Sequence, residues 1–335
     1  MIKRDSTISI IRVLAMISII AGHVFAWENI NTYQLLSIGV EIFLFVSGYL
    51  YAHKDIDSIL AFLKERITKL LIPCWIMMCV LGIATWCIEG ELESGTVLVY
   101  LLNLQGIPFV FRGIKKWPVI SGGGQLWFLT VIFACYIIMY WAKKYRADSW
   151  VDKHLLQTFI ASSFVVIIVT PLNIVLSYFW IYFWGYFWAR TDKKLSMKRK
   201  AFCILTGATL ALGVGRFVCR TILDGTPFYE VIVARVSMCL LAVWIIVCVA
   251  NITSLAPNTC DKIANSKGWI IMDRLSYPLF VTHYAFLVGP FDVSQWFGKS
   301  FLGLFVFIIA TCLSALSLDA ITRRITLCIK ESSLN

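Results

Sequence analysis

Charged residues are scarce in this chain. Only 15% of its 335 residues are Asp, Glu, Lys or Arg, whereas 59% are hydrophobic, and the mean hydropathy is +0.80. A typical soluble domain has roughly 25% charged residues and 45–50% apolar ones, so the composition excludes an ordinary soluble protein. Helices satisfy their own backbone hydrogen bonds in lipid, and we therefore predict an all-α, polytopic integral membrane protein.

Several other signals are missing. The eleven cysteines show neither metal-ligand spacing nor a disulfide framework, so no metal is expected. Most of them fall inside apolar runs, and we interpret these as small buried hydrophobic residues. No small-residue cleavage site follows Lys3 and Arg4, so we expect no cleavable signal peptide. No polar stretch is long enough for a second domain, which predicts one transmembrane domain over 1–335.

Hydrophobic runs predict about ten spans. They cover 8–27, 35–52, 72–88, 126–142, 155–172, 174–189, 201–219, 231–250, 270–289 and 301–322, with a turn at 171–173 between the fifth and sixth. The net charge is +11. Most of the 30 basic residues fall in alternate loops, which indicates an N-in, C-in orientation under the positive-inside rule rather than a nucleic-acid partner.

Three ionisable residues lie within the first two spans, namely Arg12, His23 and Glu41. A charged group at the centre of a membrane helix costs about 2.5–3.5 kcal/mol on insertion scales, so three of them indicate a polar site inside a helical bundle. Arg12 and His23 are 11 residues apart. They therefore share a helix face about 16 Å apart along the axis, a geometry suited to a long anionic ligand.

These residues carry a resemblance to a known family. Arg12, ten intervening residues and His23, followed by GVEIFLFVSGYL at 39–50, resemble the acyltransferase-3 family of membrane acyltransferases. That family has an arginine–ten residues–histidine motif in its first span and a GV-acidic-x-FF-x-x-SG-like motif in its second. Glu41 and Ser47 are the matching positions of the second motif.

Two later segments resemble further motifs of this family and occur in the same order. Arg66, Lys69 and Pro73 resemble the family's arginine-rich patch followed by proline, with lysine in place of the second arginine. Trp127 opens the fourth span where the family has a tryptophan-centred motif. Many members carry a glutamate five residues later, whereas this chain has Ile132, so no carboxylate role transfers there. Residues 54–72 also match an interfacial amphipathic helix, which is the alternative to a basic collar for a phosphorylated ligand.

The ninth span holds the fourth landmark, a Ser-Tyr pair followed by a histidine. Ser276, Tyr277 and His283 match it, and Ser276 and His283 share a helix face at a spacing of seven residues. A packed, hydrogen-bonded histidine is the alternative for His283. Asp273 and Arg274 are expected to pair with each other.

Three further features remain open. Gly122–Gly124 are interpreted mainly as a flexible joint, with close backbone approach to a ligand as the alternative. Arg235 either snorkels outward or pairs with Glu230 or a phosphate. Glu41 either orients His23 or pairs with Arg12.

The resemblance implies an O-acyltransferase of the bacterial plasma membrane, of the type without a C-terminal hydrolase-like domain. Its donor substrate would be acetyl-CoA and its acceptor an envelope glycan or lipid-linked sugar. Arg12, Arg66, Lys69, Ser47 and Trp127 would bind the donor. His23 would act as a general base or acyl carrier, and Glu41, Ser276, Tyr277 and His283 are further catalytic candidates. A transporter of a small solute or glycan precursor is the rival hypothesis, and the oligomeric state is not indicated.

Overall fold

The computed structural model describes residues 5–30, 36–52, 54, 56, 58–110, 117–145, 147–169, 175–191, 194–223, 226 and 228–332. The predicted turn at 171–173, and Lys3 and Arg4 of the orientation prediction, lie outside these residues. The described part of the chain is helical and contains no strand, in agreement with the predicted all-α class. It divides into two compact units.

The first unit comprises Met1–Ile19, Gln34–Asp55 and Val131–Asp273. Its helices, in chain order, are the first part of α1 (Ser6–Trp27), α3 (Gly39–Tyr51), most of α8 (Trp127–Lys144), α9 (Ala147–Lys153), α10 (Leu155–Val169), α11 (Val175–Thr191), α12 (Arg199–Leu223), the π-helix η3 (Phe228–Val233), α13 (Ala234–Leu255), α14 (Pro257–Ala264) and the start of α15 (Lys267–Thr282).

Helices α3 and α11 pack closely within this unit because each contributes a glycine to the contact. A Cβ on Gly48 would overlap the carbonyl oxygen of Tyr182, and a Cβ on Gly185 would overlap that of Phe45. Small residues that let backbones approach are a common device for helix packing in membranes. The segment around Gly185 is therefore a packing surface for α3.

The second unit comprises Ile20–Tyr33, Ile56–Thr130 and Arg274–Asn335. Its elements, in chain order, are the end of α1, α4 (Ile59–Arg66), the π-helix η1 (Ile67–Leu71), α5 (Ile72–Glu89), α6 (Thr96–Leu101), α7 (Ile107–Val110), the 3-10 turn η2 (Gly124–Leu126), the start of α8, the rest of α15, the 3-10 turn η4 (His283–Phe286), α16 (Ser294–Phe297) and α17 (Phe301–Ser332).

The predicted interfacial helix and the third span form one helical stretch, Ile59–Glu89. The π-helix η1 joins them, and Pro73 follows at the first turn of α5. Proline has no backbone N–H and its ring crowds the preceding turn, so a wider turn at this position lets the chain continue without a break.

Six helical stretches in the described residues are long and apolar enough to cross a membrane, namely Ser6–Trp27, Ile59–Glu89, Gly124–Lys144, Arg199–Arg220, Ala234–Leu255 and Phe301–Ile329. Helices α3, α10, α11 and α15, which fall in other predicted spans, have 13 to 17 residues each. The count of about ten spans and the N-in orientation thus stay predictions.

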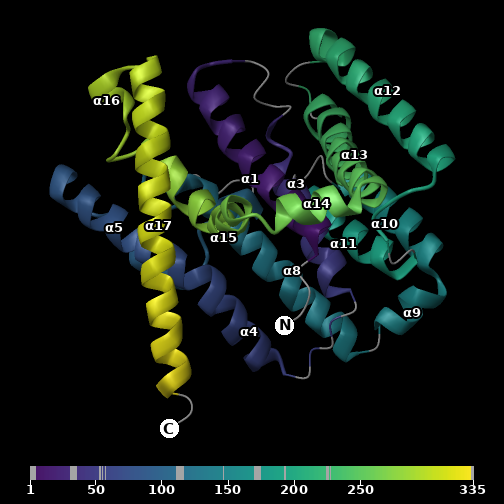
Figure 1. Cartoon of the computed structure of the whole chain (residues 1–335), viewed down its shortest axis with the longest axis horizontal. Coiled ribbons are helices and arrows are strands. Elements are labelled where there is room, and N and C mark those ends of the chain that lie inside the picture. Colours follow the sequence, from purple (N-terminus) through teal and green to yellow (C-terminus); the bar gives the residue numbers. More distant parts are fainter. Residues whose placement is uncertain are drawn as a thin grey trace. The chain divides into compact units, whose positions relative to one another are not determined.

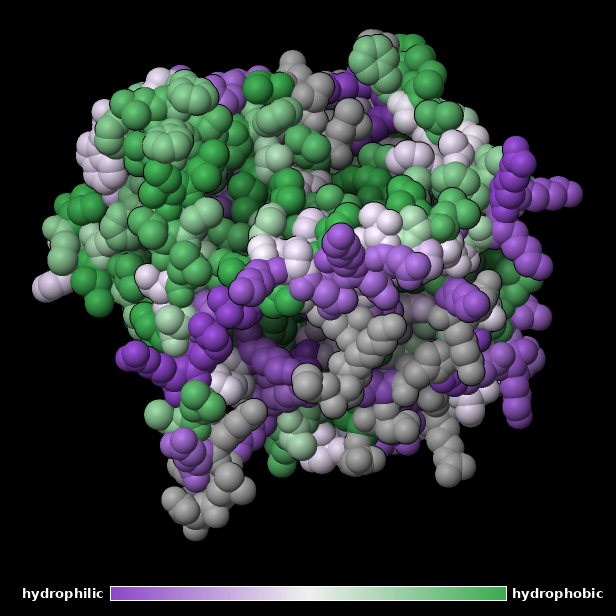
Figure 2. Space-filling model, viewed as in Figure 1, coloured by the Kyte–Doolittle hydropathy of each residue, from purple (hydrophilic) through white to green (hydrophobic). Residues whose placement is uncertain are grey.

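Along helix α17 (yellow in Figure 1), exposed apolar side chains are followed by basic ones, as expected for a membrane helix. Its N-terminal part exposes large apolar side chains such as Phe301, Leu302 and Phe305, whereas Arg323 and Arg324 follow toward its C-terminal end. In Figure 2 the hydrophobic colour gathers over the first part and hydrophilic side chains lie near the second. This distribution suits a helix that leaves a bilayer near Arg323.

Candidate active site

A pair of histidines forms the centre of the candidate site in the second unit. His23 Nδ1 and His283 Nε2 lie 2.7 Å apart, and the two rings are nearly parallel, with an interplanar angle of 12°. His283 has no exposed surface, whereas His23 is partly exposed. The structure thus brings together two of the residues that the sequence singled out, one from α1 and one from η4.

The hydrogen bonds around His283 determine which nitrogen of His23 is free. His283 Nδ1 lies 3.0 Å from the carbonyl oxygen of Leu279. A carbonyl can only accept, so His283 Nδ1 carries its hydrogen, and Nε2 of the neutral ring is an acceptor. His23 Nδ1 then donates to His283, which leaves the lone pair of His23 on Nε2. A neutral imidazole with a free nitrogen of fixed orientation is suited to accept a proton.

A tyrosine ring packs on His23, and a glutamine amide holds the backbone just before His283. The Tyr284 ring meets the His23 ring edge-on at 5.0 Å between centroids. Gln125 Nε2 donates to the Val281 carbonyl at 2.9 Å, two residues before His283. Sequence reasoning missed Tyr284 and Gln125, although each directly neighbours a landmark that it did use.

The turn that contains Gln125 packs tightly on the segment after His283. Gly122 has φ +85, and a Cβ there would come within 2.8 Å of the Val288 carbonyl oxygen. Gly289 has φ +122, and a Cβ there would come within 2.9 Å of the Gly122 nitrogen. The interpretation of Gly122–Gly124 as a flexible joint is therefore wrong for Gly122, because only glycine fits this backbone and this close contact.

Arg12 belongs to a polar cluster of the first unit. Its guanidinium lies 3.5 Å from Asp273, and 40% of its side chain is exposed. Ser9 donates to Asp273 at 3.1 Å, and the Trp269 indole donates to Ser9 at 3.2 Å. Asp273 thus pairs with Arg12 while part of the Arg12 side chain stays exposed, and an arginine in this setting is suited to bind an anion.

Glu41 is buried in the first unit, with 1% of its side chain exposed. It lies 3.4 Å from Arg235, whose guanidinium also donates to the Tyr178 hydroxyl at 2.7 Å. Arg235 thus pairs with Glu41 and does not simply snorkel. The option that Glu41 pairs with Arg12 is wrong, since Arg12 pairs with Asp273.

The expected pair between Asp273 and Arg274 is also wrong. Arg274 instead lies 3.3 Å from Asp319, in the second unit, and Arg323 lies 3.0 Å from the same carboxylate. Neighbouring residues on a helix point in different directions, so two adjacent charges find partners on other elements.

The other residues predicted to bind the acyl donor or to act in catalysis differ in exposure and in their partners. Arg66 and Lys69 each lie 2.7 Å from Glu65, with 12% and 62% of their side chains exposed. The Tyr277 hydroxyl donates to the Leu70 carbonyl of η1, and Ser276 is buried. Trp127 begins α8 in the second unit, and Ser47 lies on α3 in the first.

No group of three or more His, Cys, Asp or Glu side chains that could hold a metal ion occurs among the described residues. The family model described as an acyltransferase domain matches residues 5–320. No curated protein and no solved structure matches the chain.

Proposed function

Because the chain belongs to the acyltransferase-3 family, a family of membrane acyltransferases, we propose that it transfers an acetyl group from acetyl-CoA to a hydroxyl of a cell-envelope carbohydrate in the bacterial plasma membrane. The observation that carries this proposal is the hydrogen bond between His23 and His283. It supplies a base whose free nitrogen has a defined orientation.

The chemistry follows from that base. As the acceptor oxygen attacks the thioester carbonyl carbon, His23 Nε2 takes the hydroxyl proton. The carbon–sulfur bond then breaks, and the departing thiolate takes the proton from the imidazolium. Atoms and charge balance without a metal or a redox partner. His283 acts through His23 as a positioning residue.

The anionic end of the donor needs cations. Arg12 is a suitable ligand for a phosphate because Asp273 orients its guanidinium and 40% of its side chain remains exposed. Arg66 and Lys69 are further candidates on α4 and η1. Trp127 and Ser47 are also proposed to contact the acyl donor, and only their positions in the family motifs support this.

The thioester oxygen needs a hydrogen-bond donor as charge develops on it. Ser276 and Tyr277 are the hydroxyl candidates. The Tyr277 hydroxyl already donates to Leu70, so it would have to exchange that bond to reach the thioester oxygen. Glu41 contacts Arg235, and its proposed catalytic role is therefore indirect, through the structure around Arg235.

The test is release of free thiol from acetyl-CoA by purified protein in detergent, with and without envelope glycans. Wild type should release thiol, and His23→Ala should lower the rate by about 10²–10⁴-fold, the usual contribution of a general base. His154→Ala is the matched control, since His154 is exposed and outside the site. Equal rates for wild type and His23→Ala would remove His23 from the chemistry.

The same preparation distinguishes the alternatives. If His23 carries the acyl group covalently, acetyl-CoA without acceptor should leave an acetylated peptide containing His23, which mass spectrometry detects. No thiol release with any glycan, together with movement of an unchanged solute into vesicles, would favour the transporter hypothesis.

A further inference from the structure

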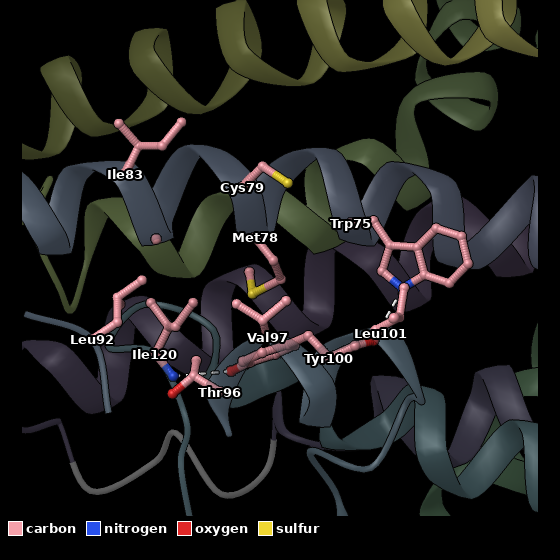
Figure 3. A pocket seen from close by; sticks show the side chains of 11 residues that line it. Trp75, Met78, Cys79, Ile83, Leu92, Thr96, Val97, Tyr100, Leu101 and Ile120 are labelled. Carbon is pink, nitrogen blue, oxygen red and sulfur yellow. Dashed lines mark hydrogen bonds between the residues drawn. The ribbon is translucent and has the colours of Figure 1, made fainter. Parts of the chain in front are cut away.

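An apolar groove lies between α5 and α6 in the second unit, with a volume of about 300 Å³. That volume is at the lower end of small-molecule pockets, which hold roughly 300–1,000 Å³. Figure 3 shows side chains of α5 on one side and those of α6, with Ile120, on the other. Its lining includes Gly82 and Ile83 of α5, Val97 and Tyr100 of α6, and Ile120.

The polar groups of the groove wall already form hydrogen bonds with neighbouring groups of the protein. The Trp75 indole donates to the Tyr100 carbonyl at 3.0 Å, and the Ile120 N–H donates to the Tyr100 hydroxyl at 3.2 Å. Burial raises the pKa of the Tyr100 phenol, so it stays uncharged. The Thr96 hydroxyl donates to the Glu93 carbonyl. A groove of this kind suits a hydrocarbon chain better than a sugar, because sugar hydroxyls would lose hydrogen bonds to water there.

The rim of the groove is apolar and exposed. Ile83 is 64% exposed, Val97 73% and Leu101 52%. Ile83 belongs to Ile59–Glu89, a stretch long and apolar enough to cross a membrane. Exposed apolar side chains on such a helix face lipid, so a chain can enter the groove directly from the bilayer.

One short turn connects this groove to the histidine pair. Ile120 lines the groove, and a Cβ on Gly123 would lie 2.8 Å from the Tyr100 hydroxyl. A Cβ on Gly124 would lie 3.4 Å from the Tyr284 ring, and that ring packs on His23. Within the segment 120–124, Ile120 thus lines the groove, and Gly124 lies next to Tyr284, the ring that packs on His23.

We infer that the groove binds the hydrocarbon tail of a lipid-linked acceptor, so that its hydroxyl-bearing head lies toward His23. The inference rests on the proposed function and makes it more specific: the acceptor is an amphiphile that reaches the site from the membrane, rather than a free glycan. Gly82 sets the depth of the groove, since a Cβ there makes only ordinary contacts, 3.6 Å from Ile120 and 3.7 Å from Leu92, and a larger side chain would fill the space.

The test is photolabelling in phosphatidylglycerol nanodiscs with a decyl glucoside that carries a diazirine on its alkyl chain. Light rather than turnover produces the signal, so the result does not depend on acyltransferase activity. We expect saturable labelling of peptides within 75–101, reduced at least fivefold by excess unlabelled decyl glucoside and unaffected by glucose. Gly82→Leu should reduce this labelling at least fivefold, and Val97→Trp, at the exposed rim, should also reduce it.

Gly213→Leu is the matched control, because Gly213 lies on α12 and a Cβ added there would meet no atom within 4 Å beyond its own stretch of helix backbone. It should leave labelling of 75–101 unchanged. Labelling that rises linearly with probe, resists competition, or persists in both Gly82→Leu and Val97→Trp would overturn the inference. It would mean that bulk bilayer lipid fills the groove. If labelling behaves as expected but no thiol is released, the lipid site stands and the proposed reaction fails.

Discussion

His23 and His283 are 260 positions apart in the chain, yet their ring nitrogens lie 2.7 Å apart. His283 in turn is held by the carbonyl of Leu279, 3.0 Å away. The two side chains are chemically identical but differ in their hydrogen bonds: His283 donates through Nδ1 and accepts through Nε2, whereas His23 donates through Nδ1. His23 presents its Nε2, and His283 fixes which nitrogen that is.

This relationship predicts the behaviour of His283 variants. His283→Ala removes the acceptor for His23 Nδ1, so kcat for thiol release should fall by about 10²-fold with KM for acetyl-CoA nearly unchanged. His283→Gln should recover part of that loss, since its amide oxygen can accept the same hydrogen bond. Equal activity of the alanine and glutamine variants would indicate that His283 only fills space.

The pair of Arg12 and Asp273 predicts an effect on donor binding. Arg12→Ala should raise KM for acetyl-CoA at least tenfold while changing kcat less, because a phosphate contact far from the thioester stabilises ground and transition states alike. Asp273→Asn should raise KM by a smaller factor, since it loosens Arg12 without removing it. Steady-state kinetics over a range of acetyl-CoA concentrations would check both, and a fall in kcat alone would contradict donor binding by Arg12.

Glu41 and Arg235 predict a stability effect. Glu41→Gln leaves the largely buried Arg235 without its counter-ion, and breaking a buried pair costs about 3–5 kcal/mol. The loss should be somewhat smaller here, because 21% of the Arg235 side chain is exposed. Thermal unfolding of the Glu41→Gln, Arg235→Met and double variants would measure it.

The double variant should lose less stability than the two single variants together. Strict additivity would show that the two charges do not interact. If Glu41→Gln changes neither stability nor thiol release, Glu41 has no part in the mechanism.

The tight surroundings of Gly122 and the open surroundings of Gly213 predict opposite effects for alanine at these two positions. Gly122→Ala should destabilise the protein by about 1–3 kcal/mol, because φ is +85 there and its Cβ would meet the Val288 carbonyl. Gly213→Ala should be neutral or stabilise by up to about 1 kcal/mol, since it lies in a helix with no close neighbour. Melting temperatures in the same detergent would show the difference. Equal melting temperatures would mean that the turn at Gly122 can relax.

Much of the fold class was predictable because it depends on local chemistry. A helix of about 20 apolar residues is stable in lipid whatever its neighbours are, so the runs at Ser6–Trp27, Ala234–Leu255 and Phe301–Ile329 were recognisable as membrane helices. Other runs were harder to judge. Helices α3 and α11 have 13 and 17 residues, below and at the lower end of the range for a membrane span, and their glycine contact depends on two segments that are distant in sequence.

The sequence by itself determined the helical membrane class, the family and the candidate residues, since composition, hydropathy and motif spacing are all properties of the chain. Only the tertiary structure decided the partners. Asp273 and Arg274 are adjacent in sequence, yet they pair with Arg12 and Asp319 respectively, because side chains one position apart on a helix point in different directions. In the same way, the partner of His23 depends on how α1 packs near η4. Contacts of that kind depend on packing between distant segments, which motif spacing does not encode.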